Sequence, residues 1–266
     1  MNQRADSWAA PDAYNRFMGR WSRLVAEQFI QWLSLPPGGN WLEVGCGTGA
    51  LTQVICLRGE PGSIVACDPS RQLVSFARLS LGDHGVSFHV ADASQLPRRD
   101  DGFDAVVSGL VLNFLPRPSE AVRAMRNRIR PGGTLAAYVW DYAGGMQFLR
   151  IFWDVAVALD PSAAELDEAR RFPLCQPDAL VGLFEQEGLR SVEAKAFEIA
   201  TPFPDFDSYW SPFLGRTGPA ASYVDSLGRA ARDQLMLGLK RRLAPAADGP
   251  IQLTARAWGV RASLPV

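Results

Sequence analysis

The feature that most constrains the fold is a regular alternation of short apolar segments with helix-length segments between residues 41 and 140. The apolar segments fall at residues 41–44, 63–67, 86–91, 104–108 and 134–140. Strands that are mostly apolar along their length and are separated by helices indicate a parallel sheet that is buried on both faces. We therefore predict an α/β fold with a doubly wound sheet, and we expect ligands to bind at the carboxyl ends of its strands.

The pattern changes after residue 141. Residues 145–175 and 203–248 have helical or irregular patterns, whereas residues 192–199 and 253–260 are strand-like. Because the first two segments do not continue the alternation, we predict that they are insertions that form a helical cap. The predicted domains are N-terminal helices over residues 1–37, a core of residues 38–202 and 249–266 that contains the insertion 145–175, and a substrate-binding helical cap over residues 203–248.

The overall charge argues against a protein that coats nucleic acid. The chain has 27 Lys and Arg against 28 Asp and Glu, for a net charge of −1, whereas phosphate backbones are bound through a basic excess. The sequence has no apolar run of the ~20 residues that span a bilayer and no apparent export signal. The 4 cysteines show no metal-binding or disulfide spacing. We expect a cytoplasmic monomer or homodimer that uses no metal and contacts neither membrane nor nucleic acid.

A glycine-rich turn follows the first predicted strand. Gly45, Gly47 and Gly49 alternate with other residues directly before a predicted helix, so the backbone there can turn tightly and approach a ligand without side chains in the way. The free N–H groups of the helix start face the same point. With Ala50, the turn also satisfies the dinucleotide-binding pattern Gly-x-Gly-x-x-Gly/Ala, although a single match of this kind is a weak signal.

Three acidic residues near strand ends narrow the choice of ligand. Asp68 ends the second strand, where a carboxylate can accept hydrogen bonds from both ribose hydroxyls. Glu43 precedes the first glycine, so its charge would repel a pyrophosphate but would suit the cationic amino group of a methionine moiety. Asp92 follows the third strand and could accept a hydrogen bond from an adenine amine. Asp68 or Asp92 could instead serve only as a helix cap.

The motifs at residues 43–50, 68–70, 91–97, 103–108 and 129–134 resemble, in order and spacing, those of class I S-adenosylmethionine-dependent methyltransferases. The resemblance extends over residues 38–141 and is to the methyltransferase type 11 branch of ubiquinone/menaquinone biosynthesis. It implies a Rossmann-like, mostly parallel sheet of seven strands, with helical insertions after strands five and six. It also implies S-adenosyl-L-methionine as cofactor and S-adenosyl-L-homocysteine as product.

The resemblance assigns cofactor contacts residue by residue. The methionine, ribose and adenine contacts would come from the turn, the strand ends and an N-terminal segment that closes over the cofactor: Tyr14, Arg20, Glu43, Gly45, Cys46, Gly47, Gly49, Asp68, Pro69, Ser70, Leu73, Asp92, Ala93, Ser108 and Leu110. Cys46 could equally be a small buried apolar residue.

Substrate and catalytic residues follow less directly from the pattern. The candidates for substrate contact are Asn113 after the fourth strand and four aromatic residues of the insertions, which could equally be the core of the cap: Trp153, Tyr209, Trp210 and Phe213. A general base, if one is used, would come from Asp141 or Tyr142 after the fifth strand, from Tyr14 or from the cap. His84 lies at the wrong edge of the sheet, and mid-strand His89 is more simply a core residue.

The predicted activity is methyl transfer to an oxygen or carbon of a small organic acceptor. The transfer is an in-line displacement that depends mainly on holding donor and acceptor in alignment. Two alternatives remain open at this point. One is a module that binds S-adenosylmethionine or S-adenosylhomocysteine without turnover, and the other is a nicotinamide-dependent oxidoreductase.

Overall fold

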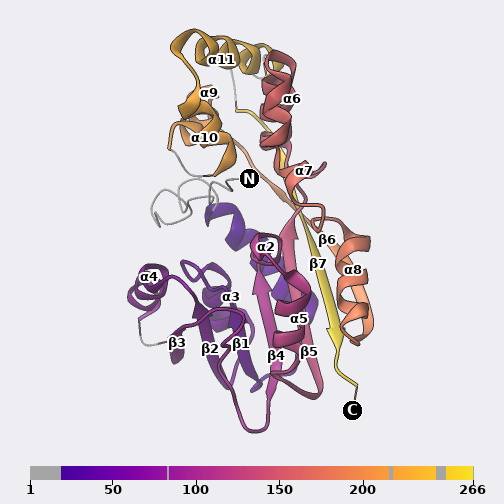
Figure 1. The fold of residues 1–266 in the computed structure, drawn as a ribbon. Helices are drawn as coiled ribbons and strands as arrows, with labels where there is room; N and C mark the ends of the chain where they lie inside the picture. The colour runs from indigo at the N-terminus through magenta and orange to yellow at the C-terminus, as the bar shows by residue number, and fades with distance from the viewer. Residues whose placement is uncertain (1–18, 83, 216–217, 244–249, 266) are drawn as a thin grey trace. The chain divides into compact units, whose positions relative to one another are not determined.

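The computed structural model describes residues 19–82, 84–215, 218–243 and 250–265 of the chain of 266 residues. Seven strands form one sheet in the order β3-β2-β1-β4-β5-β7-β6 (Figure 1). The strands are β1 (Asn40–Val44), β2 (Ser63–Asp68), β3 (Val86–Val90), β4 (Phe103–Gly109), β5 (Ile129–Trp140), β6 (Arg190–Ala200) and β7 (Thr254–Ser263).

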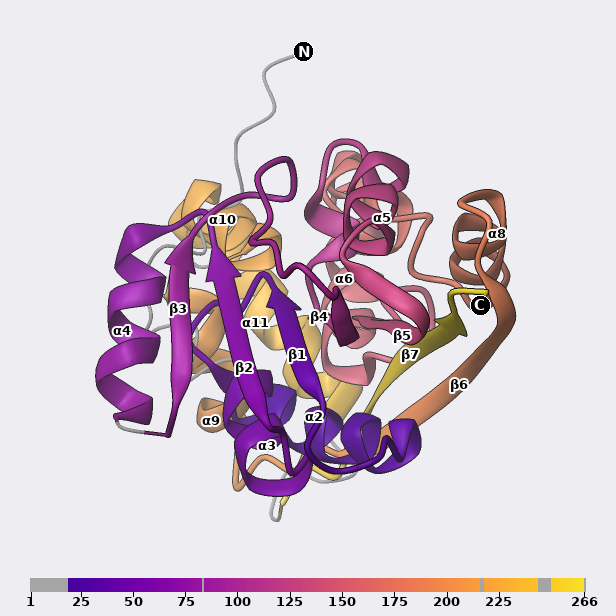
Figure 2. The ribbon, with the colours of Figure 1, turned by 90° about the horizontal axis from the view of Figure 1, so that it is seen from below.

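Five strands are parallel, as the alternating pattern predicts. Strand β1 pairs in parallel with β2 and β4, and these pair in parallel with β3 and β5. Figure 2 shows β1, β2 and β3 side by side with their arrowheads at the same edge. Strand β7 runs the other way: Gly132 donates to the Leu264 carbonyl, and Asp141 donates to that of Arg256. The expected seven-stranded, mostly parallel sheet is confirmed.

The chain divides into two compact units. The sheet unit contains residues 20–139, 174–197 and 257–266, and the helical unit contains residues 140–173 and 198–256. The helical unit thus takes in the ends of β5 and β6 and the start of β7, together with the helices that follow β5 and β6.

Several helices of the sheet unit begin at residues that favour a helix start. The helices of this unit are α2 (Arg20–Leu33), α3 (Ala50–Arg58), α4 (Arg71–Leu81), the short η2 (Leu112–Phe114), α5 (Pro118–Arg126) and α8 (Pro177–Gln186). The hydroxyl of Ser70 caps α4 by accepting from the Leu73 N–H. Proline opens α5 and α8, where its missing N–H costs nothing.

Aromatic packing joins α2 to the sheet. The Phe29 ring centroid lies 4.8 Å from that of Tyr138 on β5 and 6.2 Å from that of Phe197 on β6. A Cβ at Gly259 of β7 would overlap the Phe197 ring, so only glycine admits this ring at that position. Phe29, Tyr138 and Phe197 are almost wholly buried, which places the core of this region between α2 and the last three strands.

Strand β3 differs from the sequence expectation because it lies at the edge of the sheet. Only Phe88 of its five residues is buried. His89, expected in the core, is exposed and lies 3.0 Å from the Ser87 hydroxyl oxygen through its Nε2 atom. The expectation was wrong because a strand with a single neighbour leaves much of its length in solvent.

The helical unit has its own aromatic core. Its helices are α6 (Gln147–Leu159), η3 (Pro161–Glu165), α7 (Glu168–Arg171), α9 (Phe206–Trp210), η4 (Ser211–Leu214), α10 (Pro219–Ser226) and α11 (Arg229–Leu243). Phe152 of α6 stacks on Phe213 of η4 with ring centroids 4.5 Å apart. In the described residues, no helix is both long and apolar enough to cross a bilayer.

Candidate functional site

The carboxyl ends of the central strands bring the predicted motifs together. In the sheet register Glu43 faces Val107, Val44 faces Cys67, and Asp68 faces Val90. The glycine turn after β1, Asp68 at the end of β2 and the residues after β4 therefore share one edge of the sheet. This is the edge at which parallel α/β sheets bind ligands.

The glycine turn has a backbone that side chains would disturb. Gly45, Gly47 and Gly49 all have positive φ, at 79°, 53° and 88°, a conformation that costs other residues energy. A Cβ at Gly45 would lie 2.5 Å from Cγ2 of Val111, whereas one at Gly47 would meet nothing within 4 Å. The turn therefore packs against the segment after β4 at Gly45 and borders open space at Gly47.

Asp68 ties the turn to the start of α4. Its Oδ2 accepts from the Gly47 N–H at 3.0 Å, and its Oδ1 accepts from the Ser70 N–H at 2.8 Å. Burial raises the pKa of this carboxyl, and the two N–H donors oppose the rise. A carboxylate has about four acceptor positions, so Asp68 can fix the turn and still accept hydrogen bonds from a ligand.

Glu43 is a buried acid directly before the turn. Its side chain is almost wholly enclosed, and its Oε2 accepts from the Thr52 hydroxyl of α3 at 2.6 Å. Burial raises the pKa of Glu43 from 4.5 to about 7, against the lowering effect of the Thr52 hydrogen bond. A cation nearby would favour the ionised form, so this position is suited to an ammonium group.

The side chain of Cys46 is buried among apolar side chains. It packs in a buried cluster with Val74, Ala77, Leu81 and Phe88, and burial raises the pKa of its thiol. Cys46 thus behaves as a small apolar residue. Its predicted contact with a ligand could come only from its backbone.

The end of β4 and the segment after it supply a side-chain hydroxyl contact, a left-handed residue and a buried amide. The Ser108 hydroxyl donates to the Val44 carbonyl at 2.8 Å and so joins β4 to β1. Leu110 has φ 61°, a left-handed conformation, and its N–H donates to the Tyr138 carbonyl. Asn113 has a buried Nδ2 with no hydrogen-bond partner among the described residues. An unpaired buried donor is costly, so Asn113 is a credible contact for a bound molecule.

The predicted adenine-binding residues lie at the ends of β2 and β3. Pro69 and Asp92 are exposed, while Ser70, Leu73 and Ala93 are half-buried. Oδ1 of Asp92 accepts from both the N–H and the hydroxyl of Ser94, at 2.7 and 2.6 Å, and these donors lower the pKa of Asp92. Asp92 therefore caps a turn with one oxygen, which leaves Oδ2 for a further donor.

The N-terminal candidates are only partly described. Tyr14 lies outside the described residues. Arg20 begins α2, and its guanidinium carbon lies 4.2 Å from the centroid of the neighbouring Trp21 ring. Whether residues 1–37 close over a ligand remains a prediction.

The two candidate bases are both enclosed in the helical unit. Oδ2 of Asp141 pairs with Arg256 of β7 at 2.7 Å, and Oδ1 accepts from the Gly144 N–H at 3.1 Å. Tyr142 is buried, with its ring centroid 5.5 Å from that of Phe172. These contacts give Asp141 and Tyr142 structural roles, so a role for either as a base remains a prediction.

The four aromatic residues predicted to contact substrate all lie in the core of the helical unit. Trp153 donates through Nε1 to buried Glu168, whose pKa burial raises to about 7. The Tyr209 hydroxyl donates to the Phe148 carbonyl at 2.9 Å. Trp210 and Phe213 are buried, with ring centroids 6.0 Å apart. This packing favours the cap-core interpretation of the four residues, and their contact with substrate remains a prediction.

Sequence reasoning missed three polar partners of the predicted residues. Thr52 binds Glu43, Arg256 binds Asp141, and Glu168 binds Trp153. Thr52 gave a usable signal, since it is a polar residue on the buried face of α3 beside Leu51, Val54 and Ile55. Among the residues with described positions, no group of three His, Cys, Asp or Glu side chains could hold a metal ion.

Comparison with known proteins agrees with this geometry. Residues 42–137 match the family model described as "Methyltransferase domain". The chain is 35% identical over 123 residues to human "Probable tRNA methyltransferase 9B", covering 45% of this chain and 24% of that protein. It is 28% identical over 151 residues to the ubiquinone/menaquinone biosynthesis C-methyltransferase of Ectopseudomonas mendocina, covering 55% and 57%.

A solved structure shares the fold. Phosphoethanolamine N-methyltransferase 2 of Haemonchus contortus, in complex with phosphomonomethylethanolamine and S-adenosylhomocysteine, superposes with a TM-score of 0.60 at 17% identity. The match covers 99% of this chain and 59% of that one. The chain thus spans about a quarter of the human relative and a little over half of the bacterial one.

Proposed function

We propose, from the premise that residues 42–137 form a class I S-adenosylmethionine-dependent methyltransferase domain, that this chain transfers a methyl group to a small organic acceptor. The observation that carries the proposal is the pair of buried acids, Glu43 and Asp68, on either side of the glycine turn. Two carboxyl groups at this turn suit the amino group and ribose hydroxyls of an adenosyl amino acid, and the charge of Glu43 would repel a pyrophosphate.

The residues at this edge fit the parts of the cofactor. The open space at Gly47 leaves room beside the turn, and Asp68 keeps acceptor positions for ribose hydroxyls. Oδ2 of Asp92, the oxygen that does not accept from Ser94, would accept from an adenine amine. The buried Nδ2 of Asn113 could orient an acceptor.

S-adenosylmethionine supplies a methyl group on a sulfonium whose charge disperses as an acceptor attacks. The protein's part is to hold donor and acceptor in line and to exclude water. Alignment of this kind can lower a barrier by about 7–11 kcal/mol, so an acidic oxygen or carbon acceptor needs little help from a base.

The acceptor class is the open part of the proposal. The C-methyltransferase relative supports a small organic acceptor, whereas the human relative is named for tRNA. The even charge of the chain, −1 overall, favours the small molecule because tRNA binding needs a basic surface. The four free cysteines are in keeping with the cytoplasm as the working compartment, and a monomer or homodimer remains the expected assembly.

Calorimetric titration with S-adenosylmethionine, S-adenosylhomocysteine and NADH tests the proposal directly. We expect micromolar binding of the two adenosyl ligands alone and its loss in Asp68→Ala. NADH binding would favour an oxidoreductase. Binding without S-adenosylhomocysteine formation across a panel of phenols, quinols and tRNA would favour a module without turnover.

A second variant, Asp92→Ala, tests the cofactor site even if Asp68→Ala does not fold. Asp92→Ala should weaken adenosyl binding at least tenfold through loss of one charge-assisted hydrogen bond. Asp160→Ala is a matched control, because Oδ1 of Asp160 accepts from the N–H and hydroxyl of Ser162 in the same way but in the helical unit. Equal affinities in the two variants would remove Asp92 from the site.

A further inference from the structure

The described part of the chain has a pocket of about 480 Å³ at the amino ends of β4 and β5. Four arginines and two aspartates line it: Arg98, Arg99, Arg128, Arg130, Asp100 and Asp101. Strand β4 has 7 residues, and at about 3.3 Å per residue it separates this pocket from the glycine turn by about 20 Å. The pocket is therefore distinct from the proposed methyl-transfer site.

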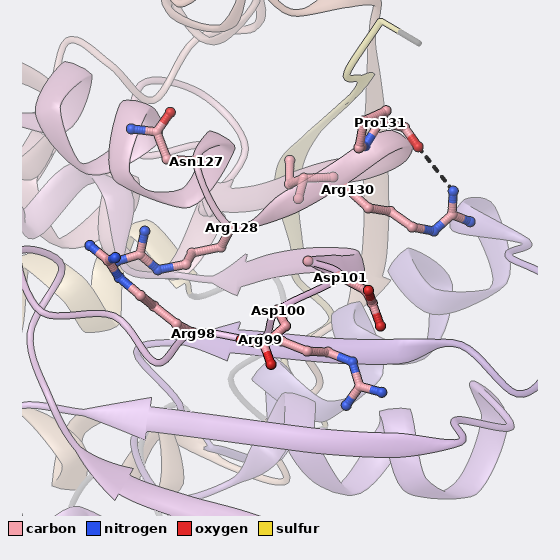
Figure 3. Close-up of a pocket in the computed structure, with 10 residues that line it drawn as sticks. Arg98, Arg99, Asp100, Asp101, Asn127, Arg128, Arg130 and Pro131 are labelled. Atoms are coloured by element: carbon pink, nitrogen blue, oxygen red, sulfur yellow. Dashed lines mark hydrogen bonds between the residues drawn. The ribbon is translucent and has the colours of Figure 1, made fainter.

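The six charged residues do not act as one group. Arg130 is neutralised by Asp104, with Nε 2.6 Å from Oδ1. In Figure 3, Arg99, Arg130 and Asp101 extend toward one side of the pocket, and Arg98 and Arg128 extend together toward the other. The second side thus carries two guanidinium groups.

The structure leaves this pair of guanidinium groups without a counter-charge. Neither Arg98 nor Arg128 has an ion-pair partner among the residues that the structure describes. Burial and the charge of Arg98 together lower the pKa of Arg128, so the two groups are close enough to repel each other. Like charges held together in this way are stabilised by an anion between them.

Arg128 is held in place by the backbone. Its Nε donates to the carbonyls of Leu96 and Pro97, both at 3.1 Å, which directs the terminal nitrogens of the guanidinium away from the loop. The backbone N–H of Arg128 donates to the Met125 carbonyl of α5 at 3.0 Å, so the backbone at this position is held as well as the side chain.

One residue that lines the pocket, Gly102, has to be glycine. Gly102 has φ 73°, and a Cβ there would lie 2.7 Å from the Arg130 backbone nitrogen. Only glycine lets this turn pack so closely against the start of β5. Glycine is therefore required where the turn before β4 meets the start of β5.

We propose that Arg98 and Arg128 bind a phosphate group carried by a small molecule. Guanidinium groups bind phosphate through paired N–H donors in a matching geometry, and the pocket is large enough for a phosphate ester. Asp100 and Asp101, which also line the pocket, would repel a continuous phosphate backbone, which favours a single anionic group over RNA. This inference does not depend on the proposed methyl transfer.

Titration of the full chain with inorganic phosphate, with chloride replacing it at constant ionic strength, tests the site. We expect saturable millimolar binding that Arg98→Gln weakens at least tenfold and that S-adenosylhomocysteine does not displace. Arg190→Gln, which removes an exposed arginine at the start of β6, should bind phosphate as the natural protein does. Arg98→Gln is the decisive variant because the Arg98 side chain, unlike that of Arg128, makes no hydrogen bond to the described backbone that folding could require.

Three results would overturn the proposal. The first is absence of saturable binding at tens of millimolar phosphate. The second is equal weakening in Arg98→Gln and Arg190→Gln. The third is a short RNA without terminal phosphates that binds through Arg98 at least a hundredfold more tightly than phosphate, which would mark the pair as part of a polyanion surface.

Discussion

At the scale of single residues, Glu43 links stability to pH. Folding raises its pKa from 4.5 to about 7, so the folded chain holds a proton in a range where the unfolded chain has lost it. Rising pH between these two values therefore favours unfolding, by about 1.4 kcal/mol per pH unit and about 3 kcal/mol in all. The stabilisation is complete below the lower value and is lost as pH rises through the upper one.

Glu43→Gln should remove this dependence. Near neutral and alkaline pH we expect the variant to be more stable than the natural protein by about 3 kcal/mol, with little difference at about pH 4. Urea unfolding at several pH values measures this. Glu168→Gln is the matched control, because burial raises the pKa of Glu168 to about 7 as well. Both variants should gain stability, and only Glu43→Gln should lose affinity for S-adenosylmethionine. Equal affinities would remove Glu43 from the cofactor site.

Gly45 and Gly47 allow strain to be separated from overlap. Both have positive φ, but only Gly45 faces Val111 closely. Gly47→Ala should lower the free energy of unfolding by about 1 kcal/mol, because alanine is strained in the left-handed conformation. Gly45→Ala should lower it by about 3 kcal/mol, because the new Cβ also overlaps Val111. Val111→Ala should recover part of the second loss but none of the first. Denaturant unfolding of each glycine variant, alone and combined with Val111→Ala, measures this, and equal losses at the two glycines would contradict the packing described for Gly45.

At the scale of elements, Asp141 connects the end of β5 to the start of β7. Asp141→Asn should lower the free energy of unfolding by about 2 kcal/mol, because Arg256 loses its ion pair with Asp141. This is the range for hydrogen bonds to charged groups. Arg256→Lys keeps the charge but not the two-nitrogen contact, so it should cost less. Thermal unfolding measures both losses.

The turnover of Asp141→Asn tests whether Asp141 also acts as a general base. With S-adenosylmethionine and an active acceptor, a loss of kcat beyond that of Arg256→Lys would support a base at Asp141. An unchanged kcat would leave Asp141 with the structural role alone.

The elements also show where sequence reasoning succeeds and where it stops. Runs of apolar residues located all five parallel strands. In β1, β2, β4 and β5 the pattern reflects burial on both faces of the sheet, whereas in the edge strand β3 only Phe88 is buried. The apolar pattern starts the fifth strand at residue 134, yet β5 begins at Ile129, because Gly132 pairs with Leu264 far along the chain. Distant pairs such as Asp141 and Arg256, separated by 115 residues, leave no local signal.

The residues of the candidate site also divide into those with a local sequence signal and those without one. The sequence could predict that the glycines, Glu43 and Asp68 lie together at one sheet edge, because they follow or end neighbouring parallel strands; their contact with a ligand stays a prediction. The aromatic residues of the insertions, such as Trp153, could not be assigned, since a buried ring in a helical core and a ring beside a substrate have the same local sequence.

At the scale of the whole molecule, charge predicts poor binding of tRNA. With a net charge of −1, the chain should bind tRNA only in the non-specific range, with Kd of roughly 1–100 μM at physiological salt. Filter binding at two salt concentrations measures this. Submicromolar binding with a steep loss at higher salt would indicate a phosphate-binding surface and would move the acceptor class toward tRNA.

The position of β7 has a consequence for synthesis on the ribosome. Strand β7 lies between β5 and β6 in the sheet, yet the ribosome makes it after both. Until residues 254–263 have left the exit tunnel, β6 has no neighbour in the sheet, and β5 ends in a row of unpaired backbone groups that can recruit other chains. A nascent chain halted before residue 254 therefore carries an open sheet edge, and emergence of β7 is the event that closes it.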